Sequence, residues 1–245
     1  AASFAAAVGL GASASVSEAK ATSSVVNDVE AYVTSASVST TMGDLIITAT
    51  ETARITLGAT ASSEAGGLFS LSSGGATATA TVTTVTKAYA DPVELDIGGD
   101  DTTGGHVSID AIDTSSATTT ATGNSDADGF ISLSGATTNA TSTLNPTVEA
   151  RLGGYTTGST TASARNAVNV YATLAATARA TASSGTFGTT GSSGGGNATA
   201  DIEPTSATVP MVKSGFSGGS ITSTHGGIAA GAVYNSDTRG KVTNG

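Results

Sequence analysis

An internal repeat is the feature that most restricts how this chain can fold. The segment "GLFSLS" from Gly67 aligns with "GFISLS" from Gly129, a numbering offset of 62 (129 minus 67). The segment "LIITATETARIT" from Leu45 aligns with "VSIDAIDTSSAT" from Val107 at the same offset, and with "VNVYATLAATARAT" from Val168 after 61 more. Because the elements recur in one order, we predict a single repetitive domain over residues 1-245.

A third element follows the same order with less regular spacing. It reads "VEAYV" at Val29, "VELDIGG" at Val93 and "VEARLGG" at Val148. The chain therefore holds about four copies, the first and last of them incomplete. Their approximate boundaries are 1-66, 67-128, 129-190 and 191-245.

Within each copy the residues alternate with a period of two, as β-strands require. Leu45 and Ile47 fall on one side of such a strand, and Ile46 and Thr48 fall on the other. Threonine and valine interrupt the alanine-rich segments, and these β-branched residues are poor helix formers. Glycine pairs separate the segments at positions suited to turns. The chain is therefore predicted to be all-β.

We predict a right-handed parallel β-helix (β-solenoid) built from about four degenerate 62-residue repeats. Aromatic residues make up only 4% of the chain and charged residues 11%, so bulky core side chains are scarce. Stacked coils are stabilised by backbone ladders and need few of them. A string of small β-sandwiches, the alternative, would bury too little apolar surface. With roughly 20 residues per coil, about 12 coils would rise about 58 Å.

Charge and composition exclude several classes of partner. The formal net charge of −10 has the wrong sign for binding nucleic acid or an anionic membrane. Cysteine is absent, which excludes disulfides and thiolate metal sites. No apolar run is long enough for a membrane-spanning helix. The first residues, "AASFAAAVGLGASASV", lack a basic region, so we expect any export signal to be removed or to lie outside this sequence.

Residues 5 to 63 are similar to one unit of the very large repetitive exported proteins of bacteria, the β-strand repeat and filamentous-haemagglutinin-like group. The similar segments are a Gly-Ala-Val strand, an Asn-led step ending in Ala-Tyr-Val, and a Gly-Asp-aliphatic strand; they lie at Gly9 to Val16, Asn27 to Val33 and Gly43 to Thr50. This resemblance implies a β-solenoid, an extracellular or cell-surface location and a role in surface architecture or adhesion. It brings no catalytic residues.

One segment suggests a metal ligand. "NSDADG" places oxygen ligands at Asn124, Asp126 and Asp128, as at the start of an EF-hand-like calcium loop. The bidentate glutamate expected eleven residues after Asn124 is absent, since Gly135 occupies that position. Such clusters also form ordinary turns. Calcium is therefore a possible ligand, and no other cofactor is expected.

Two further patterns bear on function. "GFSGG" from Gly215 matches the Gly-x-Ser-x-Gly signature of hydrolases, but without a predicted helix we interpret it as a turn and expect no enzyme. Threonine alternation at Thr77, Thr79 and Thr81 resembles the flat arrays that bind ice. The expected second rung is Thr118 and Thr120, and the matching third segment around 176 to 180 interrupts the row.

These observations predict a non-enzymatic extracellular structural protein: a β-solenoid segment of a bacterial surface adhesin, sheath or self-assembling filament. The alternative is a calcium- or glycan-binding surface module, with an ice-binding protein as a third hypothesis. Neither end of the sequence has the polar cap that a monomeric solenoid needs. The expected partner is therefore another copy, stacked head to tail as a filament, or the adjoining repeats of a longer chain; cell-surface glycans are a further possible partner.

Overall fold

The computed structural model describes residues 1–100, 103–154, 158–204 and 211–244, and these residues form strands and turns without any helix. Thus no helix in these ranges is long and apolar enough to cross a membrane. The strands make three sheets in which neighbouring strands run parallel. The prediction of an all-β chain with parallel strands is confirmed, and the arrangement is consistent with a β-solenoid.

Each sheet collects the strands that occupy the same position in successive repeats. The seven-stranded sheet has the order β1 (Ala2–Val8), β5 (Arg54–Gly66), β9 (Ser116–Asp128), β12 (Val168–Gly188), β8 (Val107–Asp113), β4 (Leu45–Glu51), and β16 (Ile228–Asn244) pairs with β12. The five-stranded sheet contains β13 (Gly191–Ile202), β10 (Ile131–Leu152), β6 (Phe69–Ala90), β2 (Ala12–Val33), and β14 (Val212–Phe216), which pairs with β10. The four-stranded sheet has the order β15 (Gly219–Ser223), β11 (Thr160–Ala164), β7 (Val93–Ile97), β3 (Ala36–Thr40).

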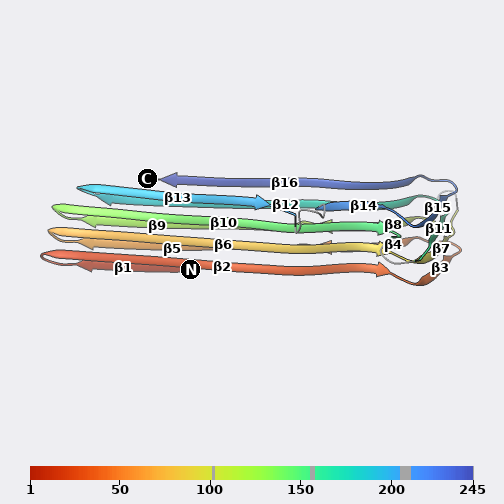
Figure 1. Cartoon of the computed structure of the whole chain (residues 1–245), viewed down its shortest axis with the longest axis horizontal. Helices are drawn as coiled ribbons and strands as arrows, with labels where there is room; N and C mark the ends of the chain where they lie inside the picture. The colour runs from red at the N-terminus through yellow and green to blue at the C-terminus, as the bar shows by residue number, and fades with distance from the viewer. Residues whose placement is uncertain (101–102, 155–157, 205–210, 245) are drawn as a thin grey trace.

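The chain passes through the sheets in a fixed order, and we call one passage a coil. It runs along the five-stranded sheet, crosses the short four-stranded sheet and returns along the seven-stranded sheet, and the next coil lies beside it (Figure 1). Residues at equivalent positions of neighbouring strands form a row across the sheet. Two of the sequence alignments are confirmed by these rows, since Phe69 pairs with Ile131 and Leu45 with Val107.

Two expectations about this path are wrong. Paired residues are 57 to 67 positions apart (Ala36 with Val93, Glu94 with Thr161), so one coil is about three times as long as expected. The long strands reach 22 residues, because neighbours on both sides pair with Gly74 and Gly75 of β6 and this glycine pair forms no turn. Four stacked strands therefore rise only about 19 Å, and the long dimension, about 70 Å, lies along the strands. The "VELDIGG" alignment also fails, because Val93 pairs with Ala36 rather than lying in the row of Val29.

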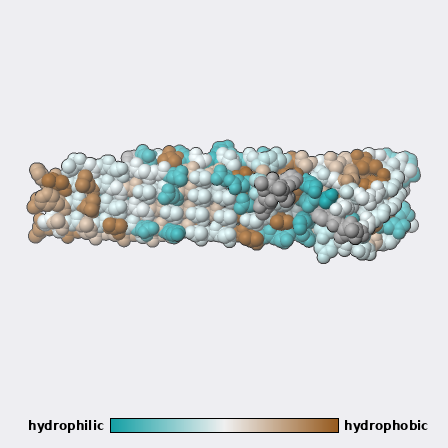
Figure 2. Space-filling view, viewed as in Figure 1, coloured by the Kyte–Doolittle hydropathy of each residue, from teal (hydrophilic) through white to brown (hydrophobic). Residues whose placement is uncertain are grey.

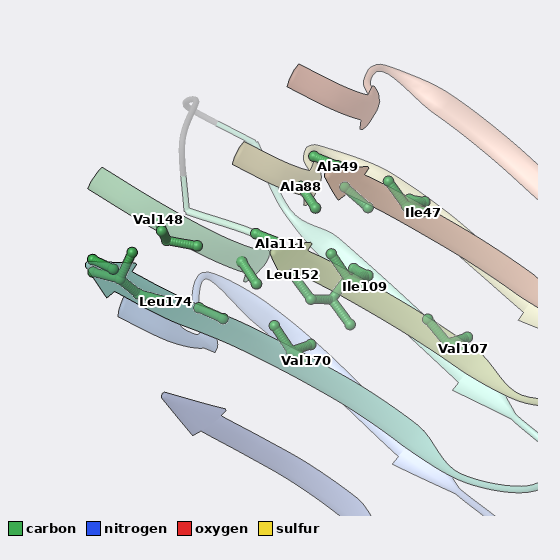
Figure 3. Packing of buried hydrophobic residues seen from close by; sticks show 14 of the residues in the cluster. Ile47, Ala49, Ala88, Val107, Ile109, Ala111, Val148, Leu152, Val170 and Leu174 are labelled. Atoms are coloured by element: carbon green, nitrogen blue, oxygen red, sulfur yellow. The ribbon is translucent and has the colours of Figure 1, made fainter. Parts of the chain in front are cut away.

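The core between the two large sheets changes character along the strands. Near the four-stranded sheet it is aliphatic, with Ile109, Leu152, Val170 and Leu174 from opposite sheets packed together (Figure 3). Towards the other end all the buried apolar residues are alanines, and Thr119, Thr138 and Ser142 are buried beside them. We call these alanines the alanine zone: Ala19, Ala21, Ala59, Ala61, Ala76, Ala78, Ala121, Ala140, Ala180 and Ala182. Small inward side chains therefore let two sheets form a core without aromatic residues.

Beyond the alanine zone, buried serines join the two sheets, and we call them the serine seam. The Ser15 and Ser63 hydroxyls are 2.9 Å apart, Ser72 Oγ donates to Ser63 Oγ at 2.9 Å, and Ser125 Oγ donates to Ser72 Oγ at 2.9 Å. Successive members alternate between the five-stranded and seven-stranded sheets. Each of these four hydroxyls is thereby satisfied, which removes the cost of burying it, whereas Ser70 Oγ and Ser134 Oγ are buried without a hydrogen-bond partner among the described residues. The sheets are so close here that a Cβ on Gly74 would collide with the carbonyl oxygen of Asn124.

Pro146 lies within β10, an inner strand, where the missing N–H needs an explanation. Leu144 O accepts from Glu203 N, and Val148 N donates to Met211 O, so alternate residues of β10 point towards β13 and β14. Pro146 lies two positions from each of these residues, so its backbone nitrogen points in the same direction as theirs. Among the described residues, the paired rows run to Leu144 with β13 and begin again at Val148 with β14. The missing donor therefore faces the interval between the end of β13 and the start of β14.

Candidate functional site

The three predicted calcium ligands lie on a strand and not in a loop. Asn124, Asp126 and Asp128 occupy alternate positions of β9, and all three are exposed on the outer face of the seven-stranded sheet. An extended strand separates such positions by about 6.7 Å. The backbone therefore cannot wrap around an ion as an EF-hand loop does, and the expected loop conformation is wrong.

A shallow hollow surrounds two of these residues. Asp126 and Asp128 line it together with Glu64 of β5 and Ala6 and Val8 of β1. Within the described ranges, no group of three or more His, Cys, Asp or Glu side chains is placed to hold a metal ion. Calcium binding here stays a prediction.

A paired substitution tests it. If calcium binds between these carboxylates, the variant Asp126→Ala/Asp128→Ala will lose the rise in melting temperature that the unchanged protein shows when calcium is added, because a ligand that binds only the folded state stabilises it. The matched control is Glu18→Ala/Asp28→Ala, which removes two exposed carboxylates from the opposite face. Scanning calorimetry across a calcium titration makes the comparison. Identical calcium responses in all three proteins would leave Asp126 and Asp128 as surface residues.

The hydrolase-like signature does not form the structure that its chemistry requires. Ser217 lies in the turn between β14 and β15. A nucleophile elbow places its serine between a strand and a helix, and the described residues contain no helix. Ser217 and Gly218 form the turn that the sequence predicted, between the end of β14 and the start of β15.

A row of alternating charges crosses the outer face of the five-stranded sheet, and sequence reasoning missed it. Its members in successive coils are Glu30, Lys87, Glu149 and Lys213. Lys87 Nζ lies 2.6 Å from Glu30 Oε1, and Lys213 Nζ lies 3.3 Å from Glu149 Oε1. The Glu30 carboxylate raises the pKa of Lys87 by hydrogen bonding. The signal was available in the sequence only once the offsets of 57, 62 and 64 between these residues were known.

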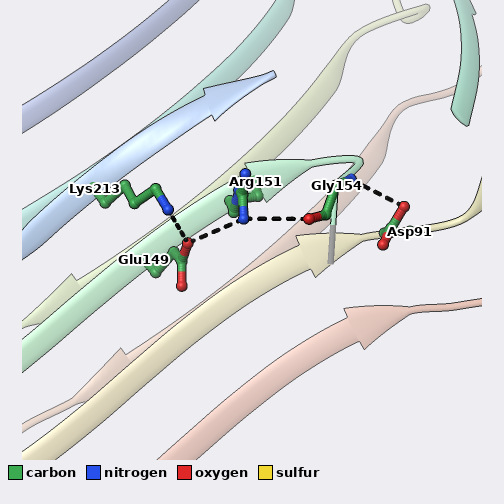
Figure 4. Close-up of polar contacts among 5 residues, drawn as sticks. All are labelled: Asp91, Glu149, Arg151, Gly154 and Lys213. Carbon is green, nitrogen blue, oxygen red and sulfur yellow. Dashed lines mark hydrogen bonds and ion pairs between the residues drawn. The ribbon is translucent and has the colours of Figure 1, made fainter. Parts of the chain in front are cut away.

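Figure 4 shows the contacts that Glu149 makes with Lys213 and Arg151. Glu149 Oε1 also lies 3.5 Å from Arg151, its neighbour on the same face of β10. In the adjacent row, the rings of Tyr32 and Tyr89 stack with centroids 5.2 Å apart. The outer face thus places side chains of neighbouring coils in fixed rows, so that a row can carry a pattern across the whole sheet.

One buried acid, Asp113, is expected to make the stability of the fold depend on pH. The Asp113 side chain accepts hydrogen bonds from Thr84 Oγ1 at 2.5 Å and from Ser115 Oγ. Burial raises the pKa of Asp113, and the Glu51 carboxylate in the next coil raises it further. The folded protein therefore binds this proton more tightly than the unfolded chain does. The resulting stability is present below the unfolded pKa of about 3.9 and is lost as pH rises through the folded pKa.

We expect Asp113→Asn to raise the melting temperature at pH 7, because it removes a buried charge while keeping an acceptor for Thr84. The gain should shrink as pH falls towards about 3.9, where the aspartate carries its own proton. Thermal unfolding of both proteins from neutral to acidic pH measures the difference. A difference that stays constant over this range would contradict the role given to the buried charge.

No family model, curated protein or solved structure matches this chain. Its class is therefore defined by the fold alone: an all-β protein of long parallel strands stacked in coils.

Proposed function

We propose that this chain is a non-enzymatic structural protein, a right-handed β-solenoid of about four degenerate 62-residue repeats within an extracellular bacterial adhesin, sheath or filament. The observation that supports it is the continuous parallel pairing of backbone between neighbouring coils. Every residue of β6, from Phe69 to Ala90, pairs with β2 on one side and with β10 on the other. A right-handed path agrees with the strong preference of connections between parallel strands.

Amide hydrogen exchange tests the structural role. If the ladder provides most of the stability, its central strands β6, β10 and β12 should exchange only through global unfolding, whereas edge strands open locally. Far-UV circular dichroism should show β-structure without helical minima. Exchange within seconds along β6 and β10, or a helical spectrum, would overturn the proposal.

A binding role for the surface is the alternative, and glycans are its possible ligands. A glycan array probed with the purified chain tests this directly. Specific and saturable binding would make the chain a binding module, and an empty array would leave the structural role.

The threonine rows support ice binding as a second candidate function. Thr79 pairs with Thr22 on one side and with Thr141 on the other, and Thr141 pairs with Thr199. The expected rung at Thr118 is wrong, because that residue lies in the other large sheet. All four threonines of the row lie on the outer face of the five-stranded sheet, whose middle shows regular pale columns in Figure 2.

The spacing of this array is close to that of tetrahedral water. Neighbouring coils are about 4.8 Å apart, and two waters bonded to a common third are about 4.5 Å apart when each hydrogen bond is about 2.75 Å. Thermal hysteresis measures binding to ice. Thr141→Glu should abolish it, whereas Thr120→Glu on the opposite face should not. Ice growth that the unchanged protein does not affect would exclude this candidate.

A further inference from the structure

We propose that two copies of this chain join head to tail in one register, the last coil of one copy against the first coil of the next. The inference rests on the proposed structural function and adds the partner and the register. Among the described strands, β2, β3 and β4 at one end of the stack, and β13, β14, β15 and β16 at the other, are each paired along one edge only. Open edges of this kind are templates for further pairing.

Apolar side chains remain half-buried at both ends, while their row partners in the inner coils are buried. Val25 in the first coil and Ile202 in the last share a row with the buried residues Val82 and Leu144. Further half-buried residues that pack against the same core occur at the first end and at the last end: Val29, Val38 and Leu45, and Val212, Phe216 and Ile221. Stacking in register would place Ile202 beside Val25 and continue the core across the junction.

The charges at the two ends are complementary in the same register. The alternating row ends with Glu30 at the first coil and Lys213 at the last, so that a second copy would extend the alternation. In the seven-stranded sheet, one row begins with Arg54 in the first coil and ends with Asp237 in the last coil. Both rows bring opposite charges together at the junction. A second copy of this chain is therefore the occupant that the charges select.

The strands of the seven-stranded sheet also fit at this junction. β16 pairs with β12 from Val168 to Ser184, whereas β12 itself continues through Gly185–Gly188. In the joined register, β1 of the next copy would lie beside these residues and continue the line of β16. The two strands overlap at two positions, since Thr243 and Ala2 belong to one row and Asn244 and Ser3 to the next. Ala1 precedes β1 and falls in the row of Val242, so at least three of the described terminal residues must leave the sheet to resolve the overlap.

Such a contact does not close on itself, so it builds a filament. Its axis lies perpendicular to the strands, and each copy adds four strand spacings of about 4.8 Å, a repeat of about 19 Å. The width of the filament is the strand length, about 70 Å. The much longer axial repeat that a stack of about 12 short coils would give is not expected.

A proline substitution on the open edge of β2 tests assembly without disturbing the pairing inside one copy. Val33 O accepts from Asp91 N, so odd-numbered residues of β2 pair with β6 and Ser24 points its N–H to the open edge. Ser24 is exposed and outward-facing. Ser24→Pro therefore removes a donor that only a second copy could use. Ser24→Thr keeps the N–H and is the matched control.

Analytical ultracentrifugation and electron microscopy then decide the matter. We expect filaments from the unchanged protein and from Ser24→Thr, and at least tenfold weaker association for Ser24→Pro with an unchanged β-spectrum. Asp237 already pairs with Arg179 and Arg239 of its own copy, so only its partner at the junction is changed: Arg54→Glu should weaken association at low salt, and added salt should reduce the difference from the unchanged protein. A monomeric unchanged protein with a β-spectrum would overturn the stacking and leave the proposed function; a spectrum without β-structure would overturn both. Filaments of Ser24→Pro as stable as those of the unchanged protein would also overturn this register.

Discussion

Replacing Leu144 with alanine is expected to lower the free energy of unfolding by about 2 to 5 kcal/mol, because the substitution removes buried methyl groups and leaves a cavity. Leu144 is fully buried in the aliphatic part of the core. Its strand β10 has neighbours on both sides, so the surrounding backbone cannot collapse into the space. Urea denaturation should show a lower midpoint with an unchanged slope.

The control lies on the same strand. Leu133 is 51% exposed on the outer face of β10, so Leu133→Ala should change stability by no more than about 0.5 kcal/mol. Equal losses at Leu133 and Leu144 would contradict the assignment of inward and outward faces. A loss at Leu144 below about 1 kcal/mol would mean that the core relaxes around the cavity.

The opposite change, Ala140→Leu, is expected to destabilise the protein by about 1 to 3 kcal/mol or more, because the alanine zone has no space for a larger side chain. Ala140 is fully buried, and its row neighbours are Ala78 and Ala198. The two sheets would have to separate locally, which the serine seam on one side of the zone resists. Chemical denaturation measures the loss.

Thr141→Leu adds a similar volume at the next residue, on the outer face, and should be tolerated. The double variant Ala140→Leu/Leu144→Ala keeps the composition of β10. Four strand residues separate its sites by about 13 Å, so the two losses should add. Partial recovery in the double variant would show that the alanine and aliphatic zones exchange volume, contrary to the packing described above.

Part of the calcium hypothesis could be followed from sequence and part could not. The alternation of Asn124, Asp126 and Asp128 with other residues is visible in the sequence. The conformation is not, because "NSDADG" fits both a turn and a strand. The strand forms because paired neighbours on β5 and β12 hold it extended. Local turn preference is outweighed by these two ladders.

The sequence by itself determined the β-structure and the repeat. Alternation with a period of two leaves strands as the only regular structure with a consistent buried face, and equal offsets at Gly67 and Leu45 place the same segments side by side. Small residues in the inward positions also decided that the core would be thin. These properties are local or periodic, so they can be derived without knowing the path of the chain.

Only the tertiary structure decided the size of the coil and the membership of each row. Both depend on where the chain turns, and a single insertion shifts the register, as the offset of 67 between Glu94 and Thr161 shows. For this reason the sequence alignment at an offset of 62 gives Thr141 and Glu149 as neighbours of Thr79 and Lys87, but it does not give Thr22 and Glu30, which lie at an offset of 57. A residue's partners across a parallel sheet lie a whole coil away along the chain, and their identity is fixed by the turns between them rather than by the residue itself.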